Sequence, residues 1–310
     1  MDAESGPGRL DWAREGTRWP NRDQSRFVVT RSLRWHVQVF GSSASDRPSL
    51  LLLHGTGAST HSWRDLAPAL SGEFRVIAPD LPGHGFTDLP EADRLSLPGM
   101  GAAIIELLTA LGETPAAVVG HSAGAAIGAW LTTSGGIRPD LLVGLNGAWL
   151  PFGGPAAPWL APATRWLAGS GTAARLFSGV ASSPIVLDRL LAGTGSVIDA
   201  AGRRGYAALV SSPGHVAAAL GMMARWDLRT LVPDLTRTLP AAATRLLLIV
   251  GSRDLTVPPS QSVELARRIP GAQLESLAGL GHLAHEERPN LVAERILANL
   301  APPHPTPRTG

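Results

Sequence analysis

Short, continuous apolar runs alternate with amphipathic segments along most of this chain. Runs that are apolar throughout are typical of strands buried on both faces of a parallel sheet. They predict strands at 49–53, 75–79, 118–119, 141–145, 245–250 and 273–277. Helical spacing and helix boundaries predict helices at 63–70, 98–111, 125–131, 259–268 and 291–300. Two β-rich runs, 26–30 and 33–40, predict an opening hairpin. Strands that alternate with helices favour an α/β fold with a mostly parallel sheet.

The pattern changes after Asn146. Residues 150–235 are rich in Pro, Gly, Ala and Trp and show no strand-like alternation, so we expect a helical insertion, or cap, within a core of 26–149 and 236–300. Residues 1–25 are expected to be an irregular arm that packs through its tryptophans, and 301–310 a disordered tail.

Composition removes several classes of function. The 310 residues include no cysteine, which excludes disulfides and thiolate chemistry. All 27 basic residues are arginines, they are dispersed, and the net charge is only +2, so we predict no nucleic-acid binding. The pI of about 10.2 is high because almost nothing titrates between neutrality and arginine. No run reaches the length of a transmembrane segment and no secretory signal is recognisable, which predicts a cytoplasmic protein.

One stretch carries a catalytic signature. Val118 and Val119 lead into Gly-His-Ser-Ala-Gly, residues 120–124, and a small-residue helix follows. A serine between two glycines at a strand-to-helix turn is the nucleophile-elbow pattern, in which a strained backbone holds the hydroxyl clear of both elements. Glycines suit this turn because a β-carbon would collide where strand and helix pass closely. The predicted nucleophile is Ser122.

The partners of such a serine stand in the expected chain order. Asp254 follows a predicted buried strand, and His282 lies in a glycine-bracketed loop after the last strand. Asp254 also has an alternative interpretation as a helix N-cap, and His285 competes with His282 for the role of base. The expected oxyanion donors are the backbone N–H groups of Ala123 and Thr56.

Taken together, HGTGAS, DLPGHG, GHSAG, GSRDLTVP and GLGHLAHEERP resemble the α/β-hydrolase family in order and spacing, over roughly residues 26–300. The resemblance implies a mostly parallel eight-stranded sheet with helices on both faces and a helical cap. The second family position for the acid is held by Asn146, which carries no charge. Dehalogenases and epoxide hydrolases of this fold use an aspartate where this chain has Ser122. The scattered histidines predict no metal site, and we expect no cofactor.

The substrate pocket is predicted from residues beside the serine and from apolar residues of the cap. The candidates are His54, Gly55, His121, Trp149, Phe152, Met222, Met223 and Trp226. His54 and His121 have a competing interpretation as packing and hydrogen-bonding residues, and many of the cap aromatics as the cap's own core. The pocket and the cap arginines favour a bulky, mainly apolar small-molecule substrate that bears acidic groups.

A narrower resemblance covers nearly the whole chain. The segments DWAREGTRWPNRDQSRF, LNGAWLPFGG, RLLAGTGS and SSPGHVAAALGMMARWDL are similar to the BchO family of magnesium-chelatase accessory proteins of bacteriochlorophyll biosynthesis. This resemblance implies a role near magnesium insertion into protoporphyrin IX, a tetrapyrrole substrate, magnesium-chelatase subunits as partners, and a place at the periphery of the photosynthetic membrane. Two functions stay open: a serine hydrolase and a binding protein without catalysis.

Overall fold

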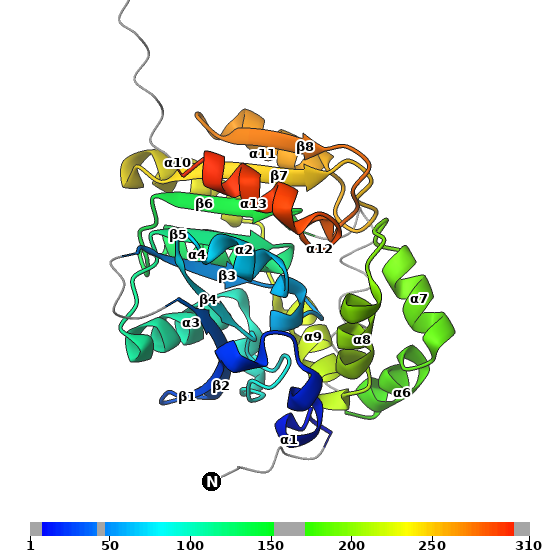
Figure 1. Ribbon diagram of the computed structural model, residues 1–310. Helices are drawn as coiled ribbons and strands as arrows, with labels where there is room; N and C mark the ends of the chain where they lie inside the picture. Colours follow the sequence, from blue (N-terminus) through cyan, green and yellow to red (C-terminus); the bar gives the residue numbers. More distant parts are fainter. Residues whose placement is uncertain (1–7, 42–46, 152–170, 301–310) are drawn as a thin grey trace, which may run out of the picture.

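A computed structural model describes residues 8–41, 47–151 and 171–300 of the chain. Its centre is one eight-stranded sheet in the order β1-β2-β4-β3-β5-β6-β7-β8 (Figure 1). The strands are β1 Ser25–Val29, β2 Arg34–Phe40, β3 Ser49–Leu53, β4 Arg75–Pro79, β5 Ala117–His121, β6 Leu141–Leu145, β7 Arg245–Gly251 and β8 Gln273–Leu277. β1 and β2 form the predicted hairpin, β2 pairs antiparallel with β4, and all pairs from β4 to β8 are parallel. The predicted fold is confirmed.

Helices cover both faces of the sheet because the inner strands are apolar on both sides. The core helices are α2 Leu66–Leu70, α3 Leu97–Leu111, α4 Ala123–Thr133, α10 Leu231–Ala242, α11 Ser260–Arg268, α12 Ala284–Glu287 and α13 Pro289–Ala298. One buried cluster joins α3, α4, α10 and α11 to side chains such as Leu51 and Val118. A second joins α2 and α13 to their neighbours on the opposite face, Leu52 and Val119.

The helix expected over 63–70 is confirmed in its second part, and its beginning is wrong. The structure has a short 3₁₀ helix, Thr60–Trp63, followed by α2. Tertiary hydrogen bonds hold the first piece: the N–H of Thr60 donates to the Asp80 carboxylate (2.7 Å), and the Arg64 guanidinium turns inward to Glu286. A local pattern cannot reveal either contact.

The insertion after β6 is helical in its described part. It contains α6 Gly171–Ala181, α7 Pro184–Ala192, α8 Ala200–Val210 and α9 Pro213–Arg225, which lie together beside the carboxyl ends of the strands (Figure 1). α10 packs on α4 of the core, and residue 235, the expected end of the cap, lies inside α10. In the described ranges no single helix has the length and hydropathy of a membrane span; only α8 and α9 pass as a pair, bent by 87°.

The arm packs against core and cap. It forms α1 Trp12–Glu15 and the 3₁₀ turns Gly16–Arg18 and Arg22–Gln24. Trp12 stacks edge-on against Phe86, and Leu10 joins a buried cluster with Leu187 and Leu209 of the cap. The predicted tail, 301–310, lies outside the described residues.

Candidate active site

Ser122 stands at the sharp turn between β5 and α4. Its φ of 51° and ψ of −115° lie in a region that side-chain-bearing residues rarely adopt. A β-carbon on Gly124 would overlap the carbonyl oxygen of Leu53, and one on Gly120 would overlap the backbone of Gly124. The glycines therefore allow the close passage that the sequence predicted, and the serine has the expected strained backbone.

The loop after β3 passes directly beside this serine. A β-carbon on Gly55 would lie 3.1 Å from the Ser122 β-carbon. The N–H of Thr56 donates no hydrogen bond within the described chain. Ala123 is the first residue of α4, so its N–H has no carbonyl one turn earlier in the helix. Two unused donors thus flank the Ser122 turn, as an oxyanion hole requires.

His54 fixes this loop. Its Nδ1–H donates to the Gly55 carbonyl (2.9 Å), and its Nε2 accepts the N–H of Leu81 (2.9 Å). Burial lowers the pKa of His54, which favours the neutral ring that this pair of bonds needs. Both ring nitrogens are occupied, so the structure gives His54 a supporting place rather than one facing a ligand.

Asp254 and His282 form a direct pair beyond β7 and β8. His282 Nδ1 lies 2.8 Å from Asp254 Oδ2, and both side chains are nearly buried. Asp254 Oδ1 accepts the N–H groups of Thr256 (2.8 Å) and Val257 (2.9 Å). Burial alone would raise the pKa of Asp254, but the bond from His282, together with those from Val257 and Asn146, outweighs burial and lowers it. The carboxylate stays ionised and holds the imidazole with Nε2 free.

Asn146 is a site residue that sequence reasoning set aside. It follows β6, has a φ of 46°, and donates from Nδ2 to Asp254 Oδ2 (2.8 Å). It stands at the alternative family position for the acid, which was the available signal. Its neutral amide made it look irrelevant, yet a donor is what the carboxylate needs there.

The structure separates the two candidate bases. His285 packs its ring against Trp63 (4.7 Å between centroids) and His121 (4.4 Å), and neither of its nitrogens has a hydrogen-bond partner in the described chain. His121 Nε2 lies 2.9 Å from the His282 carbonyl oxygen and donates to it. Burial lowers the pKa of both His121 and His285 well below the usual value, so both are neutral supports behind His282.

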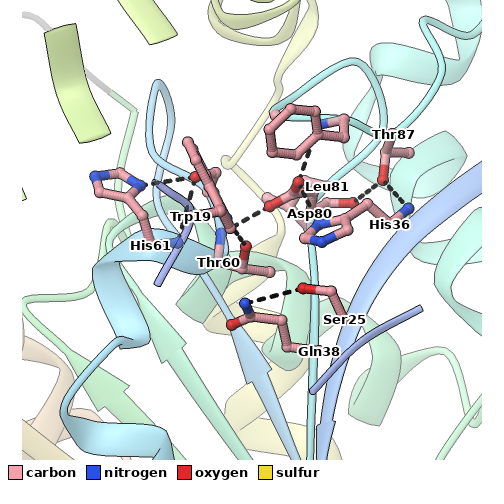
Figure 2. Close-up of polar contacts among 12 residues, drawn as sticks. Trp19, Ser25, His36, Gln38, Thr60, His61, Asp80, Leu81 and Thr87 are labelled. Atoms are coloured by element: carbon pink, nitrogen blue, oxygen red, sulfur yellow. Dashed lines mark hydrogen bonds and ion pairs between the residues drawn. The ribbon is translucent and has the colours of Figure 1, made fainter. Parts of the chain in front are cut away.

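Asp80, directly after β4, binds several segments that support the loops around the site. Figure 2 shows its carboxylate among His36, Thr60 and Thr87. His36 Nδ1 (2.8 Å) and the N–H of Phe86 (2.9 Å) bind Oδ2. Burial would raise the pKa of Asp80, but the neighbouring His36 and these hydrogen bonds lower it far below its usual value. One buried anion therefore ties β2, the 3₁₀ helix and the loop after β4 together.

The N-terminal arm also contacts the 3₁₀ helix and β2. The indole N–H of Trp19 donates to the Thr60 hydroxyl (3.0 Å; Figure 2). Gln38 Nε2 donates to the Pro20 carbonyl (2.6 Å). The arm thus supports the loops around the serine from outside.

The remaining pocket candidates lie in different places. Met222 is buried on α9, where its sulfur accepts the Thr56 hydroxyl (3.6 Å). Trp149 is fully buried in the core and donates to the Ser262 hydroxyl (3.1 Å). Met223 is more than half exposed, and Trp226 donates to the Leu95 carbonyl (3.0 Å). Phe152 lies outside the described residues.

His215 was not among the predicted site residues. From α9 it accepts the N–H of Gly85 at Nδ1 (3.1 Å) and donates from Nε2 to the carbonyl of Gly57 (3.1 Å). It joins the cap to two core loops. Within the described ranges no group of three or more His, Asp or Glu side chains could hold a metal ion.

The four site positions after β5 to β8 stand on neighbouring parallel strands, so their side chains share one edge of the sheet. This is the arrangement of the α/β hydrolases. Residues 50–295 match the family model described as the alpha/beta hydrolase family, and the chain belongs to that family.

Among individual proteins, the chain is 40% identical over 268 residues to the magnesium-chelatase 30 kDa subunit of Rhodobacter capsulatus, covering 86% of this chain and 91% of that protein. Two solved structures share the fold. An α/β-hydrolase fold protein from Burkholderia ambifaria has a TM-score of 0.70 at 24% identity, over 89% of this chain and 98% of that one. The enol-lactonase from Burkholderia xenovorans has a TM-score of 0.68 at 20% identity, over 89% and 100%.

Proposed function

We propose that this protein is a serine hydrolase that acts on an ester or amide. The observation that carries the proposal is the Asp254–His282 hydrogen bond of 2.8 Å beyond the strained turn that presents Ser122. A serine hydroxyl reacts only when a base removes its proton, and the base needs an orienting carboxylate. A protein that only binds a ligand needs neither the strained turn nor unused donors beside it.

The reaction follows from these groups. Ser122 Oγ forms a bond to the substrate carbonyl carbon while its proton passes to His282 Nε2, and Asp254 holds the imidazolium through Nδ1–H. The N–H groups of Ala123 and Thr56 stabilise the oxyanion, each by about 3 kcal/mol. The carbon–leaving-group bond then breaks, and the leaving alcohol or amine takes the proton from His282. Water, activated by the same imidazole, releases the acid and restores the hydroxyl.

We propose a tetrapyrrole ester or a similar bulky, apolar molecule as the substrate. The relative in Rhodobacter capsulatus is named as a magnesium-chelatase subunit, and it aligns with most of this chain. On the cap side, buried Met222 contacts Thr56, so an adaptable apolar side chain stands next to the proposed oxyanion hole.

A second candidate is an accessory protein that binds porphyrin or a chelatase subunit without catalysis. The name of the relative favours it, because magnesium insertion requires no acyl transfer. The described cap also exposes several apolar side chains, Leu176, Phe177 and Val180 on α6 and Ile185 on α7, which suits a protein partner.

Labelling with a fluorophosphonate probe, read by intact mass, tests the first candidate. Wild type should take up one probe per chain, Ser122→Ala none, and Ser211→Ala the full amount, since Ser211 lies exposed at the end of α8. An unlabelled wild type would contradict the hydrolase.

A magnesium-chelation assay with added protein separates the two roles. If the hydrolase supports chelation through catalysis, Ser122→Ala should fail to support it. Full support by the variant would favour the binding role, and Phe177→Asp should then remove that support.

A further inference from the structure

The loop between α7 and α8 contacts both segments that carry the proposed acid and base. The carbonyl of Thr194 accepts the N–H of His282 (3.0 Å) and that of Leu255 (3.4 Å). The hydroxyl of Ser196 accepts the N–H of Leu283 (2.8 Å). The residues belong to RLLAGTGS, a segment to which the hydrolase mechanism assigns no role.

The fit between this loop and the core is tight. Gly195 has a φ of 76°, and a β-carbon there would overlap the carbonyl oxygen of Arg253. A β-carbon on Gly281 would in turn overlap Gly195 and the Ser196 hydroxyl. Ser196 is only 8% exposed, so water cannot readily replace its hydroxyl as the acceptor for Leu283.

His282 is consequently held from two sides. Its N–H binds the cap loop, and its carbonyl accepts Nε2–H of His121 from the core. Its side chain is oriented by Asp254. The direction in which Nε2 points depends on the backbone as well as on the carboxylate, and the cap supplies half of the backbone contacts.

We propose that the cap loop, residues 194–197, positions the base, with Ser196 as a positioning residue for His282. This inference rests on the proposed serine-hydrolase function. When the cap is seated, Thr194 and Ser196 fix the backbone of His282 and Leu283, and with it the position from which the imidazole would take the proton of Ser122. When the cap moves away, those hydrogen bonds are lost and proton transfer slows. The cap thus couples its own position to the reactivity of the serine.

The test is the kinetics of fluorophosphonate labelling at several probe concentrations. Ser196→Ala leaves the Leu283 N–H without its acceptor. We expect the maximal labelling rate to fall roughly 10-fold, because small displacements of a catalytic group cost one to two orders of magnitude. The half-saturating probe concentration should stay unchanged. Ser196→Thr, which keeps the hydroxyl, should restore the rate.

Two further variants complete the design. Gly195→Ala should lower the maximal rate further than Ser196→Ala, because the added methyl group forces the loop away from Arg253. Ser211→Ala removes an exposed cap hydroxyl and should change nothing. If Ser196→Ala does not fold, Thr194→Val is the alternative: it removes the acceptor for the Ser196 N–H (3.2 Å), which loosens the loop itself, and should also lower the maximal rate.

The outcomes are distinguishable. A labelled wild type together with an unchanged maximal rate in folded Ser196→Ala overturns the role of the loop and leaves the hydrolase intact. A rise in half-saturating concentration alone would assign the loop to the pocket and also overturn it. An unlabelled wild type overturns the hydrolase and this inference together.

Discussion

At the scale of single residues, Asp254 shows how a buried carboxylate is kept ionised. Its two oxygens accept four hydrogen bonds, from His282, Asn146, Thr256 and Val257. Burial opposes ionisation, and hydrogen bonds to the charged form oppose burial. Ser122, Asp254 and His282 could be singled out as candidates because their residue types follow strands in a recognisable order. For Asn146 the sequence offered only its position after a strand, because an amide has no chemistry of its own in this site and matters through its distance to Asp254.

Asn146→Ala should therefore lower the rate at which Ser122 reacts, without unfolding the protein. The carboxylate loses one of four hydrogen bonds, so its pKa should rise and its hold on His282 should weaken. We expect the fluorophosphonate labelling rate to fall several-fold, and stability to fall by about 1–3 kcal/mol because the lost bond involves a charged group.

The matched control is Asn299→Ala, which removes an amide at the end of α13 that binds Glu275 (3.1 Å). An equal loss of labelling in the control, or none in Asn146→Ala, would contradict the role of Asn146.

At the scale of elements, the cap is joined to the core through α8 and α12. The hydroxyl of Tyr206 on α8 donates to buried Glu286 (2.8 Å), which also binds Arg64. Arg64 in turn binds Asp199 (2.9 Å), the N-cap of α8. Burial and the neighbouring Glu286 raise the pKa of Tyr206 well above its usual value, so the hydroxyl keeps its proton and remains a donor. α12 begins two residues after His282. The Tyr206–Glu286 contact and the cap loop therefore both hold the segment that runs from His282 into α12.

Tyr206→Phe should loosen this contact. Removal of the hydroxyl leaves a buried carboxylate with one donor fewer, and we expect a loss of about 1.5–3 kcal/mol of unfolding free energy in urea denaturation. Ser211→Ala, which also loses one hydroxyl from the cap but at an exposed position, should lie within about 0.5 kcal/mol of wild type. A Tyr206→Phe protein as stable as wild type would show that the contact is not a joint between cap and core.

At the scale of the whole molecule, all eight histidines in the described ranges are buried. Burial lowers the pKa of six of them, namely His54, His61, His84, His121, His215 and His285. Each is held neutral in the folded state. Glu286 has the opposite tendency, because burial raises its pKa to about 7 despite Arg64, so its burial becomes less costly as the pH falls below that value. The six histidines outnumber this single carboxyl group, so they set the direction in which stability changes with pH.

Stability should consequently fall steeply on acidification. A histidine with a lowered folded pKa contributes its full stability above the unfolded pKa of about 6.5 and loses it as the pH falls toward the folded value. For His215, whose pKa is lowered to about 4, the loss is about 3 kcal/mol.

Thermal unfolding between pH 8 and pH 4 checks this expectation. His215→Gln should be less stable than wild type at pH 8, since it loses a bridge between cap and core, and should show a shallower decline below pH 6.5. Parallel pH curves for the two proteins would contradict the role of His215.

The sequence by itself determined the sheet, the order of its elements and which serine is the candidate nucleophile. Continuous apolar runs predict strands buried on both faces, and Gly-His-Ser-Ala-Gly predicts a sharp turn, where the structure leaves Gly124 no room for a β-carbon. Tertiary structure alone decided which residues lie against the candidate acid and base. Asn146 reaches Asp254 across 108 positions, and Ser196 reaches Leu283 across 87. Such hydrogen bonds depend on distances between segments that are remote in the chain, and a local pattern of hydrophobic and polar residues carries no information about those distances.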